Sequence, residues 1–193
     1  MNQDKEDLLA QLTVDLDRSF ETLVQSYWQQ LYIFVLRRTV SPQDAEDIVS
    51  EALVRAYLAL KGYTVERMRA LKLRSWLYKI TYNEYCRHVS RSMRLELSFA
   101  QVNAGLALER DEDLSKQPEL FFESTERRQE LEGVVAALPG QYREAVSLYY
   151  FEEFSYQEIA DLLDQPLGTV KSNVHRGIRL LRKVMSARSN EVY

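Results

Sequence analysis

The sequence predicts an all-α protein made of two small helical domains joined by a flexible linker. Apolar residues recur at steps of three and four through most of the 193 residues, and no stretch alternates in the way a strand would. Six glycines and four prolines are few enough to leave room for long helices. The periodicity weakens over residues 94–123, and about thirty residues is long for a structureless connection inside one compact domain.

The composition divides the chain in the same way. The predicted parts are an N-terminal extension, a first domain, the linker, a second domain and a tail, at residues 1–18, 19–93, 94–123, 124–187 and 188–193. Residues 67–94 carry eight basic side chains and one acidic one, and residues 165–193 carry six and one. The formal net charge of −4 therefore conceals two basic blocks that flank an acidic stretch.

Several classes of protein are disfavoured by composition. Cys86 is the single cysteine, which excludes an intramolecular disulfide and a cysteine-based metal site. No run of about eighteen apolar residues occurs, and the N-terminus lacks the pattern of a signal peptide, so we expect a cytoplasmic protein without membrane insertion. Asp47 and Glu51 lie one helical turn apart, but no histidine or second carboxylate pair accompanies them. We therefore predict no metal and no cofactor.

The first domain begins with two predicted helices. Residues 1–16 have only a weak apolar periodicity, which suits either a frayed helix or a disordered tail. A helix is predicted over about 19–38, with one apolar face. Ser41 and Pro42 form a helix start signal, serine as the cap and proline at the first position, and predict a helix to about Leu60.

Acidic residues crowd the first turns of the helix over 42–60. They are Asp44, Glu46, Asp47 and Glu51. Negative charge is stabilised there by the helix macrodipole, which is sufficient to explain them. A docking surface for a partner protein is the alternative that spacing alone leaves open.

The third predicted helix covers about residues 71–91 and follows a loop that ends near Ala70. Tyr78, Tyr82 and Tyr85 step along one side of it among arginines and lysines. Aromatic rings interleaved with cations bind unpaired nucleic acid, because bases stack on rings without a fixed sequence. A helix packed on two sides, with its arginines reaching to solvent, would give the same pattern.

The second domain is predicted to have four helices. Ser124 or Thr125 can cap the first, which Pro139 ends, and a second helix runs from Gly140 to about Phe151. Ser155 and Glu158 then have the spacing of a capping box, so a third helix should start at Tyr156. Asp164-Gln165-Pro166 interrupts this helix after a few turns, and the fourth helix begins almost at once.

The last two helices resemble a helix-turn-helix. Val170, Val174, Ile178 and Leu181 form one apolar stripe of the last helix. The opposite side carries Lys171, Ser172, His175, Arg176 and Arg179. A short turn followed by a helix with basic and small polar residues is the geometry that enters the DNA major groove. An ordinary helical hairpin with a solvated basic face is the alternative.

The motifs together resemble the extracytoplasmic-function branch of the bacterial sigma-70 family. The resemblance rests on DAEDIV, RSWLY and PLGTVKS in this order, within residues 27–38, 44–57, 73–83, 138–144 and 156–183. It implies that the first domain is sigma region 2 and that the second is sigma region 4. It also implies a transcription initiation factor that binds core RNA polymerase and directs it to promoters.

The resemblance assigns roles to residues in the first domain. Asp44, Glu46, Asp47 and Glu51 would contact the β′ clamp helices of core polymerase. The loop from Tyr63 to Lys72 would capture an extruded base of the −10 element, which needs aromatic and cationic groups ready to receive it. The non-template strand would follow Tyr63, Arg74, Trp76, Tyr78, Lys79, Tyr82 and Asn83.

The second domain would bind the −35 element as duplex. The implied contacts are Gly168, Thr169, Lys171, Ser172, His175, Arg176 and Arg179. Arginine is the usual bidentate reader of guanine, and Arg176 is our candidate for that role. The other implied partners are the polymerase β flap and an anti-sigma factor.

Three positions depart from the family pattern. Arg87 stands where an Asp is often found, so local single-strand contacts could differ. Asp164 occupies a turn position usually filled by Gly, and Asn173 replaces a common Arg. The last change removes one potential DNA contact.

Two other classes of function are alternatives that the sequence supports less well than a sigma factor. A stand-alone helix-turn-helix regulator would use the first domain for dimerisation or sensing, but such a protein has no evident use for the aromatic RSWLY helix. An enzyme would need a catalytic constellation. His88 and His175 are far apart, Cys86 has no clear base, and no phosphate-binding glycine loop occurs, so we predict no catalysis.

Overall fold

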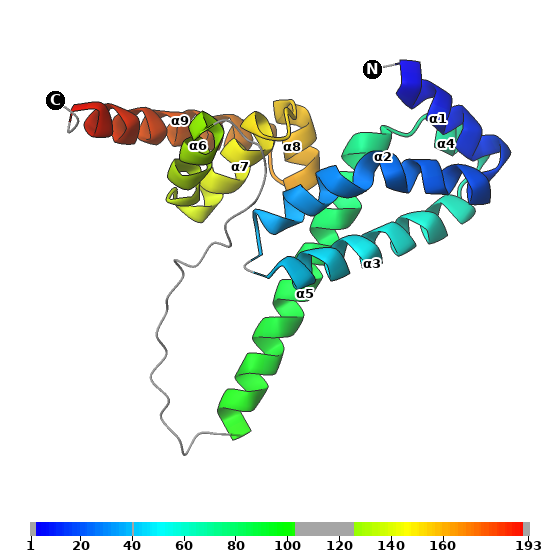
Figure 1. Cartoon of the computed structure of the whole chain (residues 1–193), viewed down its shortest axis with the longest axis horizontal. Helices are drawn as coiled ribbons and strands as arrows, with labels where there is room; N and C mark the ends of the chain where they lie inside the picture. The colour runs from blue at the N-terminus through cyan, green and yellow to red at the C-terminus, as the bar shows by residue number, and fades with distance from the viewer. Residues whose placement is uncertain (1–2, 40, 103–125, 191–193) are drawn as a thin grey trace. The chain divides into compact units, whose positions relative to one another are not determined.

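A computed structural model describes residues 3–39, 41–102 and 126–190, and every regular element within these ranges is a helix. The chain divides into two compact units, Met1–Glu119 and Leu120–Tyr193 (Figure 1). The prediction of an all-α protein with two small helical domains is confirmed.

The described part of the first unit contains five helices, in the order α1 (Gln3–Val14), α2 (Leu16–Leu36), α3 (Pro42–Lys61), α4 (Val65–Arg69) and α5 (Leu73–Val102). Three of them start at a side-chain cap. Asp15 caps α2, Ser41 caps α3 and Thr64 caps α4, each accepting a hydrogen bond from the backbone N–H three residues later. Pro42 occupies the first helical position of α3, as the start signal predicts.

The core of the first unit lies where α2, α3 and α5 pack against one another. Their apolar stripes supply it, and the side chains with no more than 1% exposure include Leu23, Leu31, Phe34, Val35, Val49, Ala56, Leu60, Leu77 and Tyr78. The rings of Phe34 and Tyr78 meet edge to face, with centroids 4.8 Å apart. This core fixes the direction of α5 relative to α3. Helix α5 carries residues predicted to contact the non-template DNA strand, and α3 carries those predicted to contact polymerase.

The first unit differs from the prediction at three places. Residues 3–14 form a packed helix, because Leu8 and Leu12 are only 7% and 1% exposed. The predicted loop after α3 contains the short helix α4. Helix α5 runs to Val102 rather than to about Arg91, since no glycine or proline occurs before Gly105. The remainder of the predicted linker, 103–123, lies outside the described residues.

The second unit contains α6 (Glu126–Ala136), α7 (Gly140–Tyr150), α8 (Tyr156–Leu163) and α9 (Leu167–Asn190). Its core gathers Val134, Val135, Leu138, Val146 and Leu181. Gly177 of α9 allows a close approach to α7, because a Cβ atom there would lie 2.4 Å from Cγ2 of Val146. The caps predicted at Ser124 or Thr125 lie outside the described residues.

Candidate polymerase-binding and nucleic-acid-binding surfaces

Helix α8 begins at a capping box and ends at a residue in the left-handed conformation. The backbone N–H of Glu158 donates to Oγ of Ser155, and the N–H of Ser155 donates to Oε2 of Glu158 at 3.0 Å. The predicted capping box is therefore present. Asp164 ends α8 in the left-handed conformation with φ 52°, and α9 begins three residues later at Leu167.

Helix α9 presents a basic face beside its buried stripe. Val170 and Val174 are fully buried in the domain, and Ile178 is half-buried. Ser172 is half-buried, whereas the other residues assigned to the −35 duplex are exposed: Gly168, Thr169, Lys171, His175, Arg176 and Arg179. Asn173 is only 8% exposed, so it lies off this face.

A second surface combines the loop after α3 with the start of α5. The guanidinium of Arg67 lies 3.8 Å from the centroid of the Tyr63 ring, and that ring lies 6.0 Å from the Trp76 ring. This row of one cation and two aromatic rings is the kind of platform on which an unpaired base stacks. Arg67 was not among the predicted site residues, although it lies within the predicted capture loop from Tyr63 to Lys72.

The remaining residues assigned to the −10 strand divide into two groups. Arg74, Lys79, Tyr82 and Asn83 are half-buried along α5, and the rings of Tyr82 and Tyr85 lie 6.1 Å apart. Tyr78 differs, because its side chain is only 1% exposed and its ring packs edge to face against the buried ring of Phe34. Its assignment to the strand's path is corrected: Tyr78 is a core residue, with the guanidinium of Arg74 5.2 Å from its ring centroid.

A buried carboxylate joins α3 to α5. Glu84 is 3% exposed and forms ion pairs with Arg55 of α3 and Arg87 of α5. Sequence reasoning missed Glu84, although it is the single acidic residue among eight basic ones in 67–94. The ion pair with Glu84 gives Arg87 a structural role at the position where the family often has Asp. Its side chain reaches Glu84 from one turn further along α5.

The exposed side of α3 carries acidic side chains in its first turns and apolar side chains further along the helix. Glu46, Asp47 and Glu51 are exposed, while Asp44 is half-buried, with Oδ2 3.7 Å from Nε2 of His88. Val54 and Leu58 follow Asp47 and Glu51 at helical spacing and are 58% and 60% exposed. Exposed apolar side chains beside charged ones are typical of a surface that another protein covers.

Two further features bear on the class of protein. Within the described residues, no group of three or more His, Cys, Asp or Glu side chains could hold a metal ion. Over the same ranges, no helix has the length and apolar character needed to span a bilayer.

The fold and these surfaces are those of a two-domain helical protein with a helix-turn-helix in its second domain. Comparison with known families assigns both domains. The family model for Sigma-70 region 2 matches residues 23–95, and the one for Sigma-70, region 4 matches residues 128–181. The chain belongs to the extracytoplasmic-function branch of the sigma-70 family of transcription initiation factors.

Individual relatives agree with this family. The chain is 30% identical over 168 residues to the ECF RNA polymerase sigma factor SigW of Bacillus subtilis, which covers 86% of this chain and 88% of that protein. It is 30% identical over 162 residues to the ECF RNA polymerase sigma-E factor of Escherichia coli, with 82% of each covered.

Solved structures show the same fold. The sigma factor RpoE of Bartonella quintana, crystallised with the anti-sigma factor NepR, aligns with a TM-score of 0.62 at 22% identity and covers 88% of this chain and 98% of that one. CnrH, in complex with the cytosolic domain of CnrY, aligns with a TM-score of 0.61 at 20% identity over 94% and 97%.

Proposed function

We propose that this sigma factor directs core RNA polymerase to its promoters through two separate DNA contacts. One contact reads the −35 element as duplex, and the other holds the non-template strand of the −10 element after it unpairs. The observation that carries the proposal is the presence, in one chain, of a basic helix-turn-helix and of an aromatic and cationic platform formed by the loop after α3, by α4 and by the start of α5.

The −35 contact is assigned to the exposed face of α9. Gly168 and Thr169 lie in the first turn of this helix, where the helix dipole favours a phosphate, and the N–H of Thr169 also donates to the carbonyl oxygen of Pro166. Arg176 is assigned the bidentate contact to guanine, and Lys171 a phosphate contact. Ser172, His175 and Arg179 complete this surface.

The −10 contact is assigned to the platform of Tyr63, Arg67 and Trp76, which we propose captures a base flipped out of the stack. Such a base costs a few kcal/mol to unstack, and stacking on a ring returns about 1–3 kcal/mol. Beyond the platform, Arg74, Lys79, Tyr82 and Asn83 are assigned to the strand.

Polymerase docking is assigned to the exposed side of α3. The acids at Glu46, Asp47 and Glu51 would meet the β′ clamp helices, with Val54 and Leu58 as the apolar part of the interface. Asp44 lies at the edge of this row, near His88. The second domain would contact the β flap.

We infer the remaining features from the family. The protein would act in the cytoplasm, where its polymerase is, and would catalyse no reaction of its own. An anti-sigma factor is a further expected partner, because one structural relative is a sigma factor bound to an anti-sigma factor. A stand-alone regulator is not favoured, since relatives that match across both domains are polymerase sigma factors.

The strand-capture role is tested with Trp76→Ala in reconstituted holoenzyme. The variant should form the closed complex normally but open the −10 region more slowly, by about fivefold or more, because one stacking surface is lost. Permanganate reactivity of unpaired thymines measures opening, and footprinting of duplex DNA measures the closed complex. Trp28→Ala, on the face of α2 outside the platform, is the matched control. Normal opening by Trp76→Ala would contradict the assignment.

A further inference from the structure

Helix α1 lies before the matched part of region 2, which begins at residue 23, yet it is packed into the first unit. It contacts α2 and also α4, the short helix in the loop after α3, and the two lie side by side (Figure 1). Leu8 and Leu12 are its buried side chains in the described range, with 7% and 1% exposure. Helix α1, which lies outside the residues matched by the region 2 family model, is thus in contact with the loop assigned to base capture.

Helix α4 depends on such a contact. Its five residues are too few for a helix that is stable alone in water. Thr64 caps it, and Met68 is its one buried side chain, at 7% exposure. Among the described helices, α1 is the one against which α4 packs substantially.

The position of α4 sets the position of the platform. Arg67 belongs to α4, and its guanidinium lies over Tyr63, which in turn lies beside Trp76 of α5. Met68 faces the interior while its neighbours Arg67 and Arg69 are exposed. A shift or fraying of α4 would therefore move the cation and the first ring away from the second ring, while leaving α3 and its docking acids in place.

We propose that α1 is a positioning element for base capture and that Leu12, which is 1% exposed in the helix that packs on both α2 and α4, keeps α4 where Arg67 and Tyr63 can receive a base. Leu12 touches no DNA in this account. The inference rests on the proposed function of the platform. It assigns to the N-terminal helix a role in promoter opening that is separate from polymerase docking.

The test measures base capture as the ratio of two complex lifetimes, the lifetime on a natural template divided by the lifetime on an abasic one. The complexes contain holoenzyme made from the full chain and core polymerase. Promoter templates with an open −10 region carry either the natural bases or one abasic site, placed in turn at each non-template position. Wild type should lose between about fivefold and about a hundredfold in complex lifetime when the captured base is removed. Leu12→Ala should shorten the lifetime on the natural template and leave the abasic template unchanged, which brings the ratio close to one.

Two further variants separate positioning from general loss of stability. Val14→Ala changes the same helix at a side chain that is 88% exposed, and it should keep the wild-type ratio. Met68→Ala removes the buried side chain of α4 and should lower the ratio as Leu12→Ala does. A general loss of folded protein would instead lower binding to both templates equally.

The outcomes are distinct. A wild-type ratio close to one at every position would contradict base capture itself, and the inference with it. A wild-type ratio that Leu12→Ala preserves would overturn the inference alone. Failure of both Leu12→Ala and Met68→Ala to assemble with core polymerase would also overturn it, because the contact would then support the whole domain rather than the loop.

Discussion

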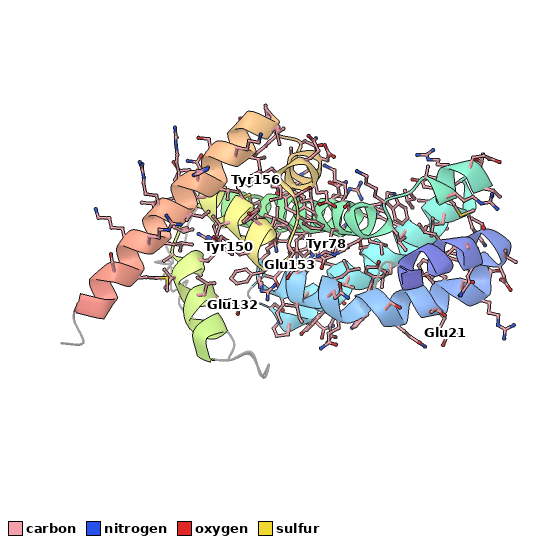
Figure 2. The ribbon with its side chains drawn as sticks, turned by 90° about the horizontal axis from the view of Figure 1, so that it is seen from above. Glu21, Tyr78, Glu132, Tyr150, Glu153 and Tyr156 are labelled. Atoms are coloured by element: carbon pink, nitrogen blue, oxygen red, sulfur yellow. The ribbon has the colours of Figure 1, made fainter. Side chains whose placement is uncertain are left out.

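Two residues at the ends of α8 hold a backbone conformation that L-amino acids rarely adopt. Glu153, in the turn before α8 (Figure 2), has φ 53°, and Asp164, at its end, has φ 52°. The left-handed region costs about 1–2 kcal/mol for most residues, and a short Asp side chain tolerates it better than a Glu. The helix-turn-helix is therefore held in shape partly against local backbone preference.

Replacing Glu153 with glycine should stabilise the second unit. Glycine removes the steric cost, although it adds entropy to the unfolded chain, so the net gain in the free energy of unfolding should be about 0.5–1 kcal/mol. Urea unfolding followed by circular dichroism measures it. Arg182→Gly, at an exposed position inside α9, is the opposite control and should destabilise by about 1 kcal/mol. A lower urea midpoint for Glu153→Gly would contradict the account of strain.

Arg176 and Lys171 should fail in different ways when truncated. Arg176→Ala should cost about 1–3 kcal/mol on the preferred −35 sequence and relax the preference at one position. Lys171→Ala should weaken binding by a similar factor on all sequences and reduce the salt slope by about one. Holoenzyme binding to a set of −35 variants at several salt concentrations separates the two. An equal loss on every sequence for both variants would contradict the roles assigned.

At the scale of elements, the junction of α3 and α5 depends on one buried carboxylate. Glu84 is 3% exposed, whereas its partners Arg55 and Arg87 are 50% and 55% exposed. The arginines can therefore return to water if the pair is broken, but the glutamate cannot easily do so. The pair connects the helix assigned to polymerase with the helix assigned to the strand, so it also sets their relative orientation.

Glu84→Gln should destabilise the first unit by about 1–3 kcal/mol. The amide keeps the shape of the side chain but loses the charge that both arginines meet, and the half-exposed partners reduce the effect below that of a fully buried pair. Thermal unfolding measures the loss. Glu21→Gln makes the same chemical change at an exposed position of α2 (Figure 2) and should stay within about 0.5 kcal/mol of wild type. Equal effects of the two substitutions would show that the pair contributes nothing.

Elements with local signals were predictable from the sequence. Helix α3 begins at Pro42 because Ser41 caps it, and α8 begins at Tyr156 because Ser155 and Glu158 form a capping box. The exposed basic face of α9 follows from its apolar spacing. These features depend on neighbours within four residues, which periodicity and capping rules describe.

Features that depend on tertiary contacts were not predictable. Tyr78 falls among cations in the sequence, but packing against Phe34 decides its burial. Helix α1 has a weak pattern, and its contacts with α2 and α4 make it a packed element. The partners of Glu84 lie on two helices, α3 and α5. Its role could therefore be identified only once the packing of α3 on α5 was known.

For the whole molecule, we propose that the two units contact the promoter at two points. Under this proposal neither unit needs to bind DNA tightly alone, because polymerase would hold both at a fixed spacing and raise the effective concentration of the second contact. The two units are joined in one chain and match two regions of one family in order. Specificity should then depend on both elements and on the distance between them.

The most direct test is transcription in vitro by core RNA polymerase, with and without this protein, on a library of genomic promoters. The account predicts new transcription starts that appear only with the protein and share a −35 motif and a −10 motif at a fixed spacing. Changing that spacing by a few base pairs should abolish these starts while each motif is intact. No new starts, or starts that depend on one motif regardless of spacing, would contradict contact with the promoter at two points.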